Sequence, residues 1–196
     1  MNQQFDQLIN SFLSNKVGIA PAFLSQALST GLRQNIAHLQ QSGQMKASGI
    51  GNGEKDLQQI TRTDKICWLS KTSENVFELE FLEHAEDFIA YLNRTCYAGI
   101  NASEFHYAVY EKGSYYKRHK DQFKNNNSRK YSLVAYLNEN WLAEDGGGLQ
   151  LYDHENTEPI LPHAQSAVLF KSDETEHAVL VANRSRLSIS GWLKRV

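Results

Sequence analysis

The chain has 196 residues, of which 41% are hydrophobic and 21% are charged, and its formal net charge is -2. This length suits one domain that buries roughly 70% of its unfolded surface. The near-neutral charge argues against a nucleic-acid binder, and no stretch approaches the length of a membrane span. The start of the chain lacks the basic residues and long apolar core of a signal peptide. We therefore expect a cytoplasmic monomer with no nucleic-acid or membrane partner.

The cysteine content excludes two further classes of structure. Cys67 and Cys96 are the only cysteines, and their spacing is not C-x-x-C. Two such residues can form neither a disulfide framework nor a zinc knuckle.

The first hundred residues are expected to be mainly helical. Apolar residues recur at helical spacing near the start of the chain, and a second helix is predicted to begin near Pro21, a suitable first-turn residue. The apolar stripes of these two helices comprise Phe5, Leu8, Ile9 and Phe12, then Phe23, Leu24, Leu28, Leu32, Ile36 and Leu39. Residues 65–69 are predicted to form a strand, and residues 77–97 return to helical spacing.

Between the second helix and this strand lies a polar, glycine-rich segment, residues 42–62. Loops of this length inside a compact domain are uncommon and often functional. We interpret it as a lid over a binding site.

From Glu104 the pattern changes to short β-type runs separated by turn-rich pieces. The runs are EFHYAVY, SYYKRH, KYSLVAYL, GLQLY, SAVLF, HAVLV and RLSISGWL. Regularly spaced short strands predict an antiparallel sandwich or barrel. Gly146–Gly148 has a structural use, because glycine permits an unusual turn before a strand. The expected fold class is α+β in one domain, 1–196, with helical support in 1–100 and the β core in 101–196.

The residues from 112 to 130 form a basic run. Residues 111–130 contain seven lysines and arginines and only two acidic residues, Glu111 and Asp121. One interpretation is a solvated face. The other is attraction of an anionic co-substrate or an acidic partner.

The candidate metal ligands are His119 and Asp121, which form an H-x-D pair, and the distant His177. Residues two apart in an extended strand project to one face, so this pair can reach a single ion. Two imidazoles and one carboxylate are the ligand set of a mononuclear non-haem Fe(II) site. A zinc hydrolase could use the same ligand types, and each histidine alone has a structural alternative.

Arg186 follows His177 by nine residues and opens the last β run. Strict alternation there places Arg186, Ser188, Ser190 and Trp192 on one face. We expect the strands of His177 and Arg186 to be antiparallel neighbours, so that the guanidinium enters the metal pocket. Such an arginine suits bidentate capture of a carboxylate.

From about Gly49 to Val196 the sequence resembles the prolyl 4-hydroxylase-like Fe(II)/2-oxoglutarate dioxygenases, particularly the bacterial relatives of the HIF prolyl hydroxylases. The motifs that carry the resemblance are TRTDKICWL (61–69), YYKRHKD (115–121), RKYSLVAYLNENW (129–141), GGGLQLY (146–152), and His177 with Arg186 and Trp192. The resemblance implies a double-stranded β-helix, or jelly-roll, core with the N-terminal helices packed on one sheet.

The resemblance also implies roles for individual residues. His119, Asp121 and His177 would bind Fe(II), while Arg186 and Tyr136 would hold the distal carboxylate of 2-oxoglutarate. Further residues of the co-substrate pocket would be Tyr110, Leu149 and Trp192. Those near a peptide substrate would be Asp64 and Arg129.

Structural alternatives stand beside these roles. Tyr110, Leu149 and Trp192 could be core packing, and Asp64 could bracket a strand end. Tyr136 has the stronger case, because a buried phenol needs a partner that a carboxylate would supply. We interpret His106, His154 and His163 as structural or solvated.

The implied activity is hydroxylation of a prolyl residue in a protein or peptide. Fe(II) would be the metal and O2 and 2-oxoglutarate the co-substrates, with succinate and CO2 released and ascorbate as a reductant. One alternative is the same chemistry on a free amino acid or small metabolite. Another is a low-turnover module that senses oxygen or 2-oxoglutarate.

Overall fold

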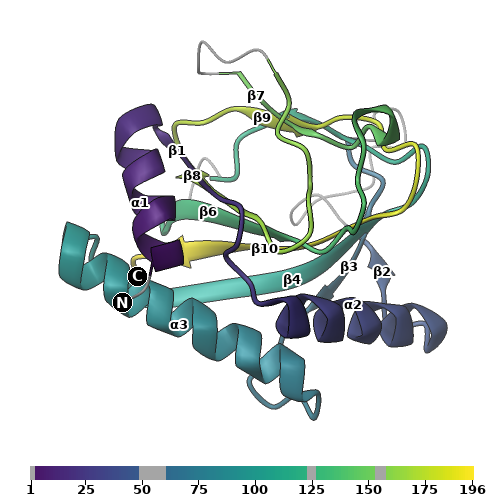
Figure 1. The fold of residues 1–196 in the computed structure, drawn as a ribbon, viewed down its shortest axis with the longest axis horizontal. Coiled ribbons are helices and arrows are strands. Elements are labelled where there is room, and N and C mark those ends of the chain that lie inside the picture. Colours follow the sequence, from purple (N-terminus) through teal and green to yellow (C-terminus); the bar gives the residue numbers. More distant parts are fainter. Residues whose placement is uncertain (1–2, 49–60, 123–126, 153–157) are drawn as a thin grey trace.

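The computed structural model describes residues 3–48, 61–122, 127–152 and 158–196. Its centre is a large antiparallel sheet, with helices on one side and a smaller sheet on the other (Figure 1). This arrangement is the expected α+β fold, a jelly-roll core with helical support. No helix among the described residues is long and apolar enough to cross a bilayer.

Both sheets are antiparallel throughout. The strand order of the large sheet is β1 (Val17–Ala20), β8 (Ala167–Lys171), β6 (Arg129–Tyr136), β10 (Arg186–Lys194), β4 (Ala102–Tyr110), β3 (Lys65–Trp68) and β2 (Lys46–Ala47). The strand order of the small sheet is β5 (Tyr116–His119), β9 (His177–Val179) and β7 (Leu149–Leu151). A short 3-10 helix, Ala143–Asp145, precedes β7.

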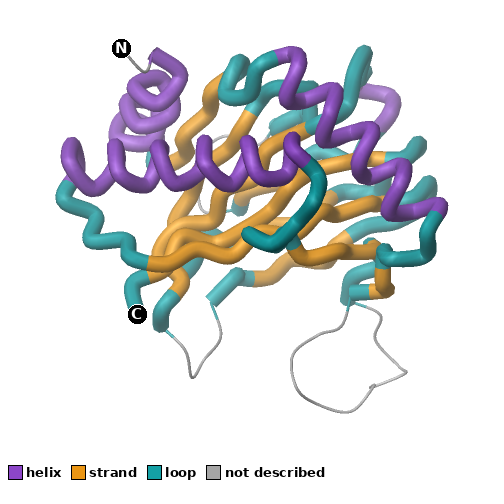
Figure 2. Tube along the Cα trace, turned by 90° about the horizontal axis from the view of Figure 1, so that it is seen from below, coloured by secondary structure: helices purple, strands orange, loops and turns teal. Residues whose placement is uncertain are grey.

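Three helices cover the outer face of the large sheet, as the view from below shows (Figure 2). They are α1 (Gln3–Asn15), α2 (Gln26–Gln41) and α3 (Val76–Cys96). The α3 helix begins at a cap, because Asn75 Oδ1 accepts hydrogen bonds from the amides of Phe77 and Glu78.

The second helix begins later than the sequence indicates. The Ser25 hydroxyl accepts a hydrogen bond from the Leu28 amide and caps α2 there, so Pro21 lies in the turn before the helix. Phe23 and Leu24 are buried as expected, but they belong to the chain that leads into the helix. A serine cap therefore outweighs the proline signal.

The strands of the large sheet divide their side chains between two environments. On β6, Leu133 and Ala135 join the core shared with the helices, whereas Val134 and Tyr136 pack toward the small sheet. On β10, the core side includes Ile189 and Leu193. Of the four residues expected on the opposite face of β10, Arg186, Ser190 and Trp192 line a pocket between the two sheets, and Ser188 accepts a hydrogen bond from Arg186.

The seven predicted β runs are confirmed as β4 to β10, and the strand at 65–69 as β3. Two short strands, β1 and β2, were not predicted. The expectation that the strands of His177 and Arg186 are neighbours is wrong. β9 belongs to the small sheet and β10 to the large one, so the connection between them crosses from one layer to the other.

The predicted lid at 42–62 falls largely on residues 49–60, which lie outside the described residues, as does His154. The basic run also loses residues 123–126. Cys67 and Cys96 do not form a disulfide with each other.

Candidate metal centre and co-substrate pocket

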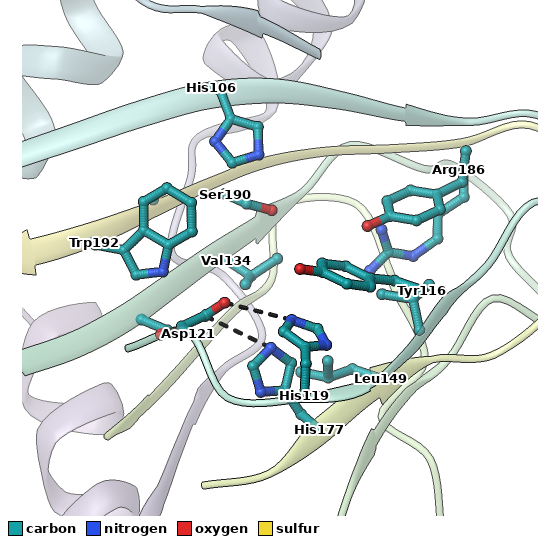
Figure 3. Close-up of a pocket in the computed structure, with 14 residues that line it drawn as sticks. His106, Tyr116, His119, Asp121, Val134, Leu149, His177, Arg186, Ser190 and Trp192 are labelled. Carbon is teal, nitrogen blue, oxygen red and sulfur yellow. Dashed lines mark hydrogen bonds and ion pairs between the residues drawn. The ribbon is translucent and has the colours of Figure 1, made fainter. Parts of the chain in front are cut away.

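The small sheet brings the two candidate histidine ligands together. β5 pairs with β9 so that His119 lies directly opposite His177. Asp121 follows just beyond the end of β5. The ligand atoms that these three residues offer all lie within 4.8 Å of one another (Figure 3). They could therefore hold a single ion.

Hydrogen bonds orient both imidazoles. Nδ1 of His119 lies 2.7 Å from the carbonyl oxygen of Lys117, and Nδ1 of His177 lies 3.2 Å from that of Thr175. A carbonyl oxygen only accepts, so each Nδ1 carries a proton, and a bound metal ion would meet the lone pair of each Nε2. Fixing the tautomer through the second nitrogen is a common property of metal-binding histidines.

The carboxylate is fixed as firmly as the imidazoles. Burial opposes the ionisation of Asp121, but His177, His119 and the Ser132 hydroxyl together lower its pKa. The Ser132 hydroxyl donates to Asp121 Oδ2 at 2.7 Å, and Ser172 lies 2.9 Å from Ser132. Two neutral nitrogens and one charged oxygen are a donor set that suits Fe(II) and leaves other coordination positions open.

Arg186 lies deep in the same pocket, with 1% of its surface exposed. Its Nε donates to the carbonyl oxygen of Gly147 at 2.8 Å, and its Nη1 to Ser188 Oγ at 3.3 Å. Among the described residues no carboxylate forms an ion pair with it. A buried cation without a counter-charge is costly, so this end of the pocket suits an anion.

Tyrosines complete the anion-binding end. The guanidinium carbon of Arg186 lies 4.9 Å from the ring centre of Tyr110 and 5.1 Å from that of Tyr136. The Tyr136 hydroxyl is fully buried and has no hydrogen-bond partner among the described residues. A carboxylate between Arg186 and Tyr136 would satisfy both groups, so the residues present fit 2-oxoglutarate.

Residues 105–194 match the family model of the 2OG-Fe(II) oxygenase superfamily. This part of the chain, which holds most of the β core, is similar to the 2OG-Fe(II) oxygenases. The sequence and fold of the chain as a whole are similar to those of prolyl 4-hydroxylases.

Three solved structures illustrate this similarity. A Pseudomonas putida prolyl-4-hydroxylase is 26% identical, with 98% of this chain and 100% of that chain covered and a TM-score of 0.86. A Trichoplax adhaerens prolyl hydroxylase, in complex with a fragment of the hypoxia inducible factor oxygen degradation domain, is 25% identical, with coverages of 99% and 90% and a TM-score of 0.86. A Phytophthora capsici prolyl 4-hydroxylase shares the fold at 19% identity, with coverages of 98% and 63% and a TM-score of 0.79.

The remaining predicted site residues divide into two groups. Tyr110, Leu149 and Trp192 line the pocket, and their contact with a co-substrate stays a prediction. Asp64 does not line it. Its buried carboxylate instead accepts two hydrogen bonds from Arg62, at 2.7 and 2.6 Å.

Arg62 connects this ion pair to the metal centre. Its guanidinium carbon lies 4.4 Å from the ring centre of Tyr116, and the Tyr116 ring stacks on His119 with centres 3.5 Å apart. Asp64 therefore supports a metal ligand through two intermediate side chains. A role for Asp64 near the substrate stays a prediction.

Arg129 lies beside the pocket, with its guanidinium carbon 3.4 Å from the ring centre of Trp192. It also donates to the main-chain oxygen of Asp121 at 3.0 Å and to Glu104 at 2.8 Å. Arg129 thus turns inward from the basic run, whereas Lys117 and Lys120 are exposed.

Six pocket-lining residues were not predicted from the sequence: His106, Tyr116, Ser132, Val134, Val179 and Gly191. His106 was interpreted as structural or solvated because it has no spacing relation to the metal ligands. Strand alternation could have found it, since His106 lies on the same face of its strand as the predicted Tyr110. The same argument applies to Ser132, which shares a face with Tyr136. His163 is exposed, as expected.

Proposed function

We propose that this protein hydroxylates a prolyl residue in a protein or peptide, using Fe(II), 2-oxoglutarate and O2. In the balanced reaction one oxygen atom enters a substrate C–H bond and the other enters succinate, with release of CO2. The observation that carries the proposal is the buried Arg186, without a carboxylate partner among the described residues, in the same pocket as the two-histidine, one-carboxylate cluster.

The side chains of the pocket have separate tasks in this proposal. His119, Asp121 and His177 hold Fe(II), and Arg186 with Tyr136 holds the distal carboxylate of 2-oxoglutarate. Val134, Leu149 and Trp192 form apolar walls that limit the entry of water. When bound, the iron and the keto acid supply the oxidising chemistry, while the protein supplies orientation and a dry pocket.

The prolyl target is supported by the relatives. Two structures that cover nearly the whole chain are prolyl hydroxylases, and one of them holds a peptide fragment. We assign Arg129 and, through Arg62, Asp64 to the substrate side of the pocket. We also propose that residues 1–196 act as a single catalytic domain.

The test begins without oxygen. Protein loaded with Fe(II) is titrated with 2-oxoglutarate, and the weak visible absorption band of a chelated keto acid is recorded. We expect a saturable band in the wild type, and a much higher 2-oxoglutarate concentration for the same band in Arg186→Leu. Air and a library of capped peptides with one central proline are then added, and mass spectrometry records the gain of one oxygen atom with matching succinate.

Each outcome has a clear meaning. Iron binding without a band would rule out the dioxygenase. A band followed by oxidation of free amino acids or small metabolites, and of no peptide, would replace the prolyl target with that alternative. A band with less than one turnover on every substrate would favour the sensing module.

A further inference from the structure

A buried histidine forms part of the pocket wall, away from the arginine end. His106 lies on β4, opposite Trp68 on β3 and Ser190 on β10, and only 3% of its surface is exposed. Its ring centre lies 5.4 Å from that of Trp192 and 5.1 Å from that of Trp68. In Figure 3, His106 and Trp192 lie on one side of the pocket and Arg186 on the other.

The strand geometry agrees with this separation. Arg186 and Trp192 lie six residues apart on β10, so their Cα atoms are about 20 Å apart in an extended strand. A ligand held by Arg186 therefore leaves the wall around His106 and Trp192 for a second molecule, the substrate.

His106 has hydrogen-bonding capacity that the protein leaves unused. Its Nδ1 is buried and has no partner among the described residues, and the same is true of Nε1 of the neighbouring Trp192. A buried polar atom without a partner costs about 1–3 kcal/mol. Such atoms in a pocket wall indicate a ligand that completes their hydrogen bonds.

The charge of the imidazole limits what this ligand can be. Burial lowers the pKa of His106 to about 4, and Arg62 adds to this effect. The ring is therefore neutral at pH 7 and carries one N–H donor. The indole of Trp192 is also a neutral donor. Two neutral donors suit a neutral acceptor, and the peptide bonds on either side of a proline offer carbonyl oxygens.

The proline itself restricts the choice further. Its nitrogen carries no hydrogen in a peptide, so the only main-chain hydrogen-bonding atoms of a prolyl residue are acceptors. We propose that His106 is a specificity-determining residue whose N–H donates to a carbonyl oxygen flanking the target proline. This inference rests on the proposed function and names the group that distinguishes a peptide substrate from a smaller one.

The experiment compares amide and thioamide peptides, because a thioamide sulfur accepts hydrogen bonds poorly. The capped single-proline peptide with the highest turnover by the wild type is synthesised with sulfur replacing the carbonyl oxygen before, and then after, the proline. His106→Phe keeps an aromatic ring and removes both nitrogens, while His106→Gln keeps an N–H donor. His163→Leu removes an exposed histidine and is the matched control.

We expect the wild type and His163→Leu to lose roughly fivefold to tenfold in kcat/KM at one of the two thioamide positions, as for one lost hydrogen bond. His106→Phe should show a KM raised roughly tenfold for the normal peptide and no preference for amide over thioamide. His106→Gln should recover most of the loss. The kcat and the 2-oxoglutarate titration should not change. A general packing defect would alter both.

Three results would contradict the inference. If the wild type accepts both thioamides equally well, or if His106→Phe keeps the normal KM, the inference is wrong and the proposed function stands. If His106→Phe does not fold, the thioamide preferences of the wild type and of His106→Gln decide whether the inference is right. If the wild type gives the keto-acid band but hydroxylates no peptide, the proposed function has failed and the inference with it.

Discussion

The guanidinium carbon of Arg186 lies 5.1 Å from the ring centre of Tyr136, and the Tyr136 hydroxyl has no hydrogen-bond partner among the described residues. The two side chains come from β10 and β6, which pair directly in the large sheet. Their juxtaposition is therefore a consequence of strand register. It leaves a donor-rich end of the pocket for a carboxylate.

Removal of the Tyr136 hydroxyl should affect binding and stability differently. In Tyr136→Phe we expect the dissociation constant of 2-oxoglutarate to rise roughly tenfold, the loss of one hydrogen bond to a charged group. The ligand-free protein should lose no stability, because the deleted hydroxyl had no partner within the described protein. Titration of the keto-acid band and thermal unfolding measure the two effects.

Tyr107→Phe is the matched control for this change. The Tyr107 hydroxyl is equally buried but accepts a hydrogen bond from Asn35 at 3.0 Å, on the helix side of the sheet. This variant should lose about 1 kcal/mol of unfolding free energy and keep its 2-oxoglutarate affinity. The same response in both variants would refute the assignment of Tyr136 to the pocket.

Gly147 should be needed for the position of Arg186. It has a φ of +63°, and a Cβ there would lie 3.0 Å from Cδ of Arg186. We expect Gly147→Ala to weaken 2-oxoglutarate binding several-fold or more and to leave Fe(II) binding largely intact. Gly113→Ala is the control, because φ is +87° there but no atom lies within 4 Å of the added Cβ.

Both glycine variants carry the backbone cost of a positive φ, about 1 kcal/mol. Only Gly147→Ala moves the arginine. Equal 2-oxoglutarate dissociation constants in the two variants would show that backbone strain, and not a displaced Arg186, weakens binding.

Ser132 should tune the metal site through Asp121. Ser132→Ala removes the hydroxyl that donates to Asp121 Oδ2 at 2.7 Å. The expected result is a fall in Fe(II) affinity of roughly tenfold or more, as for the loss of other groups that orient metal ligands. Anaerobic calorimetry measures this affinity without turnover.

Ser166→Ala is the matched control for Ser132→Ala. Ser166 is also buried, but its hydroxyl donates to the carbonyl oxygen of His163, away from the metal ligands. It should keep the Fe(II) affinity of the wild type. An unchanged affinity in Ser132→Ala would remove Ser132 from the metal site.

The Arg62–Asp64 ion pair should make a pH-dependent contribution to stability. Burial raises the pKa of Asp64, but Arg62 and Ser48 outweigh it and lower the pKa below its usual value. The folded state then binds fewer protons than the unfolded state. The contribution is therefore present above the unfolded pKa of about 3.9 and is lost as the pH falls through the folded pKa.

Asp64→Asn should lower the unfolding free energy at pH 7 by roughly 3 kcal/mol, because it leaves the largely buried Arg62 without its counter-charge. The difference from the wild type should shrink as the pH is lowered below about 4. Glu111→Gln breaks the exposed pair with Lys65 and is the control, with an expected loss below about 1 kcal/mol. A difference that is constant with pH would exclude the ion pair as its cause.

The sequence predicted the strands and the pairing of His119 with Asp121 because both depend on local pattern. Alternation along β10 identified the face that carries Arg186 and Trp192, and a two-residue spacing placed His119 and Asp121 together. The start of α2 was predicted less well, since the cap at Ser25 competes with Pro21. The two missed strands, β1 and β2, are only 4 and 2 residues long.

The relation between β9 and β10 could not be read from spacing. Nine residues allow either a hairpin or a crossing between layers, and hydrogen bonding with distant strands decides between them. His177 pairs with β5 and β7, whereas Arg186 pairs with β4. The same limitation hid Tyr116, whose partner Arg62 comes from elsewhere in the chain.

This crossing places the groups for the metal and for the carboxylate in different layers. His119 and His177 belong to the small sheet, and Arg186 and Tyr136 to the large one. A molecule that reaches from the histidines to the arginine therefore acts as a reversible cross-link between the two halves of the sandwich. Amide hydrogen exchange in β5, β7 and β9 should consequently slow most when the metal and the keto acid are present together, because either alone leaves the layers less firmly joined.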